Sequence, residues 1–259
     1  MSDPQPPKET NFRPILESVA RTKGSLVSVF SDFACMCACA FAMQAREEEY
    51  LEIAGCYNRE ELNRFSKAMG YMVMEMESKA FTDILGVYYC EVQSKFTRDA
   101  HGEFYTPQEV GKLMAKISVN TEAVIETGKP ISVNDPASGS GGLVLSVAEE
   151  FAKAGAVDLI RATCQDISKT ACDMAYINMT LWGIPARIIW GDTLRGSING
   201  QWENVHWHQV GEPLRERFNC FMKMLNAKTM PKEVKSKSEG ERDVRFHTND
   251  VGQQEWIFD

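Results

Sequence analysis

A glycine-rich segment in the middle of the chain combines an acid with a backbone that can approach a ligand closely. Residues 135–142 read Asp-Pro-Ala-Ser-Gly-Ser-Gly-Gly, between an expected strand at 131–135 and an expected apolar helix at 143–154. In open α/β sheets, ligands bind outside the carboxyl ends of the strands, where glycines let the main chain come close. The segment therefore predicts a ligand-binding loop, and the simpler alternative is a plain tight turn.

Two common phosphate-binding loops do not fit this segment. The third glycine of a dinucleotide fingerprint, GxGxxG, would fall at Val144. A P-loop needs a Lys followed by Ser or Thr, and no such pair follows Gly142. The pattern thus argues against both an NAD site and a P-loop NTPase.

Two further acids stand where the next expected strands end. Asp166 follows the strand predicted at 159–165, and Asp192 follows the strand predicted at 187–190. A carboxylate at the second position suits ribose hydroxyls, and one at the third could accept from an exocyclic amine. A single strand-end Asp is common in turns. Three of them at successive strand ends, one beside a glycine-rich loop, predict a nucleoside ligand.

These segments resemble the gamma-type N6-adenine DNA methyltransferases, and most of all the modification subunits of type I restriction systems. The resemblance covers roughly residues 80–195 in the family's motif order. Residues 102–107, Gly-Glu-Phe-Tyr-Thr-Pro, look like the upstream aromatic motif, and 135–142 look like the loop that binds S-adenosylmethionine (SAM), with Ser138 where Cys is common. Residues 165–166 and 191–194 resemble the segments for the ribose and adenine of SAM.

The resemblance implies SAM as the cofactor and no metal. The cofactor-binding residues that it implies are Phe104, Tyr105, Thr106, Asp135, Pro136, Ser138, Gly139, Gly141, Asp166 and Asp192. It implies methyl transfer to DNA adenine, with DNA as substrate and a specificity subunit or other restriction-modification protein as partner. The alternative is a catalytically inactive SAM-binding homologue that acts as a regulatory, decoy or anti-restriction partner. A small-molecule methyltransferase would not explain the DNA-enzyme motif order.

The family's catalytic motif, Asn or Asp followed by Pro-Pro and an aromatic residue, is missing from the chain. Its amide and carbonyl oxygens would hold the target amine in line with the methyl group, and its aromatic ring would stack on the flipped base. The one Pro-Pro pair is Pro6-Pro7, and after Asp192 the only prolines are Pro213 and Pro231. The catalytic residues are therefore unassigned, and the isolated chain is expected to be weak or inactive.

Residues 201–209 stand near the place where that motif would be expected. They hold two Trp and two His residues, and the histidines, His206 and His208, would point to opposite sides of a strand. That spacing argues against a metal site. Packing of an irregular loop is favoured over a replacement catalytic or base-stacking site, which Trp202 and Trp207 could otherwise supply.

The order of elements around these residues predicts the architecture. Strand, helix, strand, helix and strand between 131 and 190 predict an α/β fold with a parallel, Rossmann-like sheet, shortened on its C-terminal side. An all-helical region precedes it, with a buried helix at 25–44 and a capping box at Asn58 and Glu61. The predicted divisions are a disordered tail (1–10), a helical domain (11–100), a SAM-binding domain (101–230) and a linker with a tail or edge strands (231–259).

Composition limits the remaining possibilities. The chain has 259 residues and a net charge of -8, so any DNA contact needs a local basic patch, such as 211–245 with nine basic and six acidic residues. Three of the eight cysteines lie in the apolar run 33–41, where they are expected to be buried, reduced thiols. No signal-peptide pattern is present, and uninterrupted apolar runs reach only about 11 residues. A cytoplasmic protein without a membrane partner is expected.

Overall fold

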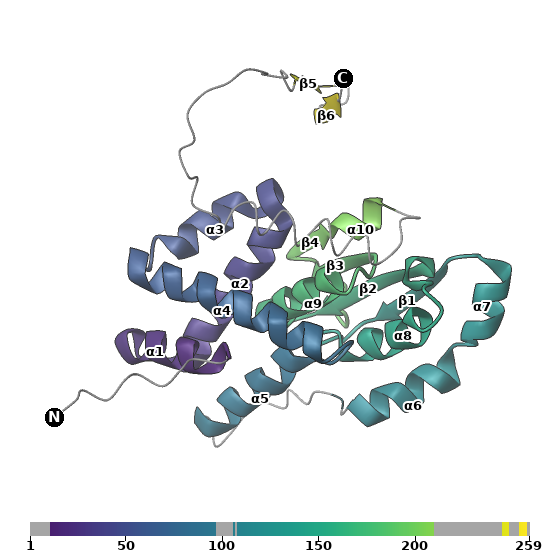
Figure 1. Ribbon diagram of the computed structural model, residues 1–259, viewed down its shortest axis with the longest axis horizontal. Coiled ribbons are helices and arrows are strands. Elements are labelled where there is room, and N and C mark those ends of the chain that lie inside the picture. Colours follow the sequence, from purple (N-terminus) through teal and green to yellow (C-terminus); the bar gives the residue numbers. More distant parts are fainter. Residues whose placement is uncertain (1–10, 97–105, 107, 210–244, 249–253, 258–259) are drawn as a thin grey trace. The chain divides into compact units, whose positions relative to one another are not determined.

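The computed structural model describes residues 11–96, 106, 108–209, 245–248 and 254–257 (Figure 1). Residues 1–221 form one compact unit, and residues 222–259 form a second. The helical region of the first unit comprises α1 (Arg13–Lys23), α2 (Leu26–Ala42), the 3-10 turn η1 (Met43–Arg46), α3 (Glu47–Ala54), α4 (Arg59–Ser78) and α5 (Ile84–Phe96). After this helical region the chain forms the α/β part of the first unit. Its elements are α6 (Gln108–Ser118), α7 (Thr121–Thr127), β1 (Ile131–Asp135), α8 (Gly142–Ala152), η2 (Val157–Leu159), β2 (Ile160–Asp166), α9 (Lys169–Leu181), β3 (Ala186–Trp190), β4 (Gly200–Glu203) and α10 (Val205–His208).

The N-terminal helices begin where the sequence places their caps. The side chain of Ser25 accepts from the backbone of Ser28 and opens α2. At α4, Asn58 accepts from the backbone of Glu61, and Glu61 accepts from the backbone of Asn58, which confirms the predicted capping box. The apolar α2 packs against α1, α3 and α9, so it joins the helical region to the sheet (Figure 1).

One helical stretch is long and apolar enough to cross a membrane by length and composition alone. It runs from Leu26 to Ala54, and 56% of its most apolar window is buried inside the protein. The expectation of no spanning segment considered only uninterrupted apolar runs. This stretch is longer because it includes charged residues such as Asp32 and Arg46. Its packing against α9 is the environment of a core helix.

Four strands form the sheet that carries the predicted site. Their order is β1-β2-β3-β4, with β1, β2 and β3 parallel and β4 antiparallel to β3. Helices α8 and α9 pack on the strands, and along β2 the residues Ile160, Ala162 and Cys164 are buried. The predicted α/β fold with its parallel strands is therefore confirmed.

The residues between those buried positions make the second face of the sheet polar. On β2 they are Arg161, Thr163 and Gln165, which are only partly buried. Parallel strands covered on both faces are normally apolar throughout. This alternation is instead typical of a sheet with one face packed on helices and one face in contact with water.

The segment after β3 differs from its expected irregular loop. Residues 200–203 form β4, and Asn204 opens the short helix α10 by accepting from the backbone of Trp207. His206 and His208 lie on this helical turn, because the Asn204 cap starts a helix just before them. His206 is buried with its Nε2 2.9 Å from the carbonyl oxygen of Thr180, whereas His208 lies 3.2 Å from Glu203.

The second unit contains a hairpin within its described residues. Strands β5 (Arg245–Thr248) and β6 (Gln254–Ile257) pair antiparallel, within the segment where the sequence left a tail or edge strands open. The basic stretch 211–245 lies outside the described residues except for Arg245, so its role stays a prediction.

Candidate functional site

The strand register brings the three predicted acids to one edge of the sheet. Asp135 pairs with Cys164 on β2, so Asp166 lies two residues further along the neighbouring strand. Asp166 pairs with Trp190 on β3, and Asp192 lies two residues beyond Trp190. Each step of two residues is about 7 Å along a strand. The acids thus form a staggered row across the carboxyl ends of β1, β2 and β3.

The glycine-rich loop bends over the end of β2. The backbone N–H of Ser138 donates to the carbonyl of Gln165 at 2.9 Å, and that of Gly139 donates to Asp166 Oδ2 at 2.8 Å. Gly139 and Gly141 have φ angles of 53° and 87°, which side-chain-bearing residues rarely adopt. Because Asp166 itself holds the loop, the loop and the second acid form one structural unit.

The two glycines have different surroundings. Gly141 precedes α8, and a Cβ built on it would lie 2.8 Å from Met179 Cε on α9. Met179 Cε is the end of a flexible side chain that can move aside, so the left-handed φ of 87° is the stronger reason for glycine at this position. Val at 139 or 141 is expected to strain the loop, because both positions have left-handed φ angles.

Asp166 and Asp192 already accept hydrogen bonds from the protein. The second oxygen of Asp166 accepts from the backbone of Ser168 at 2.8 Å. Asp192 Oδ1 accepts from the backbone of Leu194 at 2.9 Å and of Arg195 at 3.1 Å. A carboxylate has about four acceptor positions, so each keeps capacity for ligand hydroxyls or amines.

Of the three acids, Asp135 accepts the fewest hydrogen bonds from the described residues of the protein. Its Oδ1 accepts from the backbone of Ala137 at 3.2 Å. Burial raises the pKa of Asp135, and the nearby negative charge of Asp166 raises it further. A positively charged ligand group placed here would relieve this repulsion, so the edge favours a cation.

Three residues outside the predicted set of cofactor-binding residues also lie at this edge. Thr193 Oγ1 donates to the carbonyl of Pro136 at 2.6 Å and joins the turn after β3 to the loop after β1. Ile167 and Leu194, which follow the second and third acids closely, are 66% and 98% exposed. Exposed apolar side chains beside two acids could cover a planar ring, and this exposure has no signal in the sequence.

The remaining predicted cofactor-binding residues differ in exposure, and two of them lie outside the described residues. Pro136 is exposed at the start of the loop, and Ser138 is buried, with its Oγ 3.4 Å from the carbonyl of Gly139. Thr106 is exposed ahead of α6. Phe104 and Tyr105 lie outside the described residues, so the upstream aromatic motif stays a prediction.

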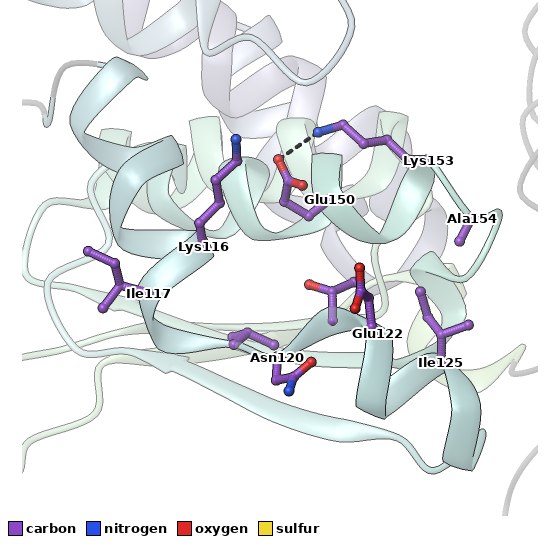
Figure 2. A pocket seen from close by; sticks show the side chains of 10 residues that line it. Lys116, Ile117, Asn120, Glu122, Ile125, Glu150, Lys153 and Ala154 are labelled. Atoms are coloured by element: carbon purple, nitrogen blue, oxygen red, sulfur yellow. Dashed lines mark hydrogen bonds and ion pairs between the residues drawn. The ribbon is translucent and has the colours of Figure 1, made fainter.

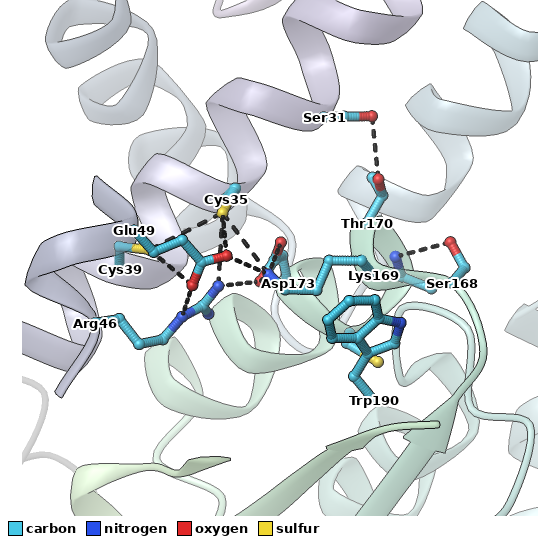
Figure 3. A network of polar contacts seen from close by, with 12 residues as sticks. Ser31, Cys35, Cys39, Arg46, Glu49, Ser168, Lys169, Thr170, Asp173 and Trp190 are labelled. Carbon is cyan, nitrogen blue, oxygen red and sulfur yellow. Dashed lines mark hydrogen bonds and ion pairs between the residues drawn. The ribbon is translucent and has the colours of Figure 1, made fainter. Parts of the chain in front are cut away.

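A second charged cluster lies where α2 and α3 meet α9 (Figure 3). Arg46 is bound to Asp173 at 2.7 Å and to Glu49 at 2.8 Å, and Lys169 is bound to both of these carboxylates at 2.8 Å. Burial would raise the pKa of Glu49, but hydrogen bonds from Arg46 and Lys169 bring it down to about 2. We call Arg46, Glu49, Lys169 and Asp173 the interface network.

Potential metal ligands adjoin the interface network. Ligand atoms of Cys35, Cys39 and Glu49 lie within 4.8 Å of one another. A hydrogen bond with Cys39 and burial both raise the pKa of Cys35, which opposes the thiolate that a metal needs. Arg46 and Lys169 also occupy the two oxygens of Glu49. These charges favour a closed set of ion pairs over a metal site.

Two hollows in the first unit lie away from the row of acids. One of about 570 Å³ is formed by α6, α7 and α8, where Lys153 and Glu150 form an ion pair at 2.6 Å (Figure 2). The other, of about 460 Å³, is lined by Tyr176, Trp202, Glu203 and His208, among others. Neither is lined by a predicted cofactor-binding residue.

Comparison with solved structures finds partial similarity. A Listeria monocytogenes protein described as a class I S-adenosylmethionine-dependent methyltransferase gives a TM-score of 0.42 at 19% identity, over 71% of this chain and 53% of its own. The type I restriction-modification methyltransferase subunit of Streptococcus thermophilus gives 0.37 at 22% identity, over 71% of this chain and 39% of its own.

Comparison of sequences is more informative. The methylase subunit of the type I restriction enzyme MpnII of Mycoplasma pneumoniae is 29% identical over 150 residues, which is 56% of this chain and 26% of the relative. This chain thus spans about a quarter of that relative's length. The family model described as N-6 DNA methylase matches residues 80–210, just over half of the chain. Because this match takes in the glycine-rich loop and all three strand ends, the chain belongs to the N-6 DNA methylase family.

Proposed function

We propose that this chain binds SAM at the carboxyl ends of β1, β2 and β3. The observation that carries the proposal is the hydrogen bond from the Gly139 backbone to Asp166, which joins the glycine-rich loop to the middle acid of the row. The positive φ angles at Gly139 and Gly141 suit a main chain that lies against a ligand. The family match, which covers the same residues, supports this assignment.

The acceptor groups at this edge fit SAM in chemical terms. Asp135, whose ionisation is opposed by burial and by Asp166, suits the positively charged end of the cofactor. Asp166 suits the ribose hydroxyls, and Asp192 suits the adenine amine, with Ile167 and Leu194 beside the ring. When bound, SAM supplies an activated methyl group. The residues of this chain bind and orient the cofactor, and the turn at Thr193 keeps the strand ends together.

At the level of the reaction, we propose adenine-N6 methyl transfer to DNA as part of a type I restriction-modification assembly. DNA and a specificity subunit would be the partners, and the cytoplasm would be the place of action. The chain has no Pro-Pro-aromatic motif after Asp192, so the acceptors that hold the target amine are not among its residues in the usual form. We therefore assign cofactor binding to this chain and leave the catalytic residues unassigned.

Calorimetry with SAM and with its demethylated product, S-adenosylhomocysteine, tests the binding proposal. We expect both to bind the purified chain, and we expect Gly139→Val to abolish binding, because Val at a φ of 53° distorts the loop. Gly128→Val is the matched control, since Gly128 has a φ of 61° at the end of α7 and no atom near its Cβ position. A folded chain that binds neither ligand would end the proposal.

A transfer assay with labelled SAM and adenine-containing DNA tests the reaction. We expect little or no transfer by the purified chain alone, because in-line positioning of the amine can lower a barrier by roughly 7–11 kcal/mol and the usual acceptors are missing. Robust N6-methyladenine formation by the chain alone would contradict this expectation. Trp202, His206, Trp207 and Glu212 would then be the first residues to substitute. Binding without transfer in any restriction-modification assembly would favour the inactive, regulatory alternative.

A further inference from the structure

A half-buried acid outside the row of strand ends contacts the glycine-rich loop. Asp83 directly precedes α5, 52 positions before Asp135 in the chain, and its carboxyl group meets three donors. Asp83 Oδ1 accepts from the backbone of Gly86 at 2.9 Å and from Asn178 Nδ2 at 3.1 Å. Asp83 Oδ2 accepts from the hydroxyl of Ser140. The carboxyl thus links the start of α5, the loop and α9.

Asn178 closes this set of contacts from the opposite side. Its Nδ2 also donates to the carbonyl of Ser140 at 2.9 Å, so Ser140 is held through both its side chain and its main chain. Ser140 and Asn178 are both fully buried. Ser140 lies between Gly139 and Gly141, the two residues whose left-handed conformations shape the loop. Fixing Ser140 therefore fixes the backbone on both sides of it.

Capping of α5 alone does not account for these contacts. An N-cap needs one acceptor, and Ser, Thr or Asn supply it as well as Asp does. The second oxygen of Asp83 serves the loop, and a carboxylate is the side chain with enough acceptor positions for all three donors. Burial raises the pKa of Asp83, and the hydrogen bonds from Ser140, Gly86 and Asn178 oppose that rise.

We propose that Asp83 is a positioning residue that holds the glycine-rich loop in its ligand-binding shape through Ser140. Asp83 does not touch the ligand. It sets the main chain at Gly139 and Gly141, and thereby the contact between Gly139 and Asp166. The inference rests on the proposed function, because it concerns the affinity of the same site for SAM.

Two substitutions separate the loop contact from the cap. Asp83→Ser keeps an acceptor for Gly86 but is too short to serve Ser140 and Asn178 as well. Ser140→Ala removes the hydroxyl from the loop side and leaves α5 untouched. We expect each to weaken SAM binding about tenfold or more in calorimetry, since each loses hydrogen bonds to a charged group. Asp83→Asn should stay within about threefold of the wild type, because its amide can accept from Gly86 and donate to Ser140.

Asn120→Ala is the matched control for a lost cap. Asn120 caps α7 by accepting from the backbone of Ala123 at 3.1 Å. We expect this variant to lower the melting temperature without changing SAM affinity, whereas Ser140→Ala should lower SAM affinity in addition to any loss of melting temperature. The double variant Asp83→Ser/Ser140→Ala should bind no more weakly than the weaker single variant, because both remove the same contact.

Each outcome bears on one of the two proposals. If the wild type binds SAM and Ser140→Ala and Asp83→Ser bind as well as it does, the positioning role is wrong and the binding proposal stands. Losses that multiply in the double variant would also overturn it, since the two residues would then act separately. If the wild type binds neither SAM nor its demethylated product, the proposed function fails and the positioning role fails with it. If Asp83→Ser does not fold, Ser140→Ala alone decides the question.

Discussion

The interface network and the row of acids at the strand ends lie close together in the sequence, but their acidic side chains have different kinds of partner. In the interface network, Asp173 lies against Arg46 and Lys169 and is almost fully buried. At the strand ends, Asp166, seven residues earlier, accepts from backbone N–H groups of Gly139 and Ser168. The interface network pairs its acids with the basic side chains of Arg46 and Lys169, whereas the acids at the strand ends accept mainly from backbone N–H groups.

This difference separates a role in the fold from a role in binding. The charge of a buried carboxylate such as Asp173 is already neutralised by the guanidinium and the ammonium beside it, so it has little attraction left for a ligand. Removing one partner from such a pair leaves an uncompensated charge, which is why the pair resists change. A carboxylate whose ionisation is opposed by burial and a neighbouring acid, as at Asp135, gains most from a ligand cation.

The largest expected effect is on stability, in the interface network. Asp173→Ala should lower the free energy of unfolding by about 3–5 kcal/mol, because Arg46 and Lys169 would lose a buried counter-charge. Denaturant titration followed by circular dichroism measures this loss. A change below about 1 kcal/mol would mean that the network does not join the helical region to α9 as its geometry indicates.

The next effect is on binding, at the strand ends. Asp135→Asn should weaken SAM binding by about 1–3 kcal/mol, because a charge-assisted contact is lost. The free energy of unfolding should be unchanged or slightly higher, because the substitution removes a carboxylate whose pKa is raised in the folded state. Calorimetry and denaturant titration on the same variant test both parts. A large loss of stability with normal binding would show that Asp135 serves the fold and not the ligand.

Acid pH should act on the interface network. The pKa of Glu49 is about 2 in the folded state against an ordinary value of 4.5, so its contribution to stability is fully present above about pH 4.5. That contribution is lost as the pH falls through the folded-state pKa. Unfolding free energies measured between pH 5 and pH 2 should therefore decrease less in Glu49→Gln than in the wild type. Equal slopes for the two proteins would show that the ion pairs of Glu49 add no stability.

The smallest expected effect comes from an ion pair that belongs to neither region. Glu60 and Arg64 lie one helical turn apart on α4, with side chains that are 76% and 38% exposed and 2.6 Å between their charged atoms. Glu60→Gln should change the free energy of unfolding by no more than about 0.5 kcal/mol, since water and salt screen exposed pairs. A larger loss would weaken the argument that burial, rather than pairing alone, distinguishes the interface network.

Local sequence signals predicted the parts of this fold that depend on neighbouring residues. The capping box at Asn58 needs contacts within one turn, and the strand predicted at 159–165 depends on its own run of residues, so both are visible in the sequence. The row of acids was also predictable, because parallel strands connected by helices bring their carboxyl ends to one edge. The assignment of ligand groups to those acids is still a prediction.

The contacts that sequence reasoning missed join residues far apart in the chain. Asp83 and Ser140 are 57 residues apart, and Thr193 and Pro136 are likewise 57 apart. Arg46 and Asp173 are separated by 127 residues. A single Asp, Thr or Arg carries no local pattern that specifies such a partner. Strand β4 was missed for a related reason, since its four residues are too few for a clear alternation and its partner β3 defines it.

The order of the sheet has a consequence for the timing of ligand capture. Within the described sheet, β2 and β3 each have a hydrogen-bonded strand on both sides, whereas β1 has one on one side only. Asp166 belongs to β2 itself, whereas Asp192 lies two residues beyond the end of β3. Asp166, at the end of β2, should therefore be the least mobile of the three acids. A ligand that binds to it should cost the protein little conformational entropy. The turn that carries Asp192 and the almost fully exposed Leu194 has more freedom to lose. We therefore expect a ligand to be held first at the end of β2 and the turn after β3 to become ordered around it afterwards.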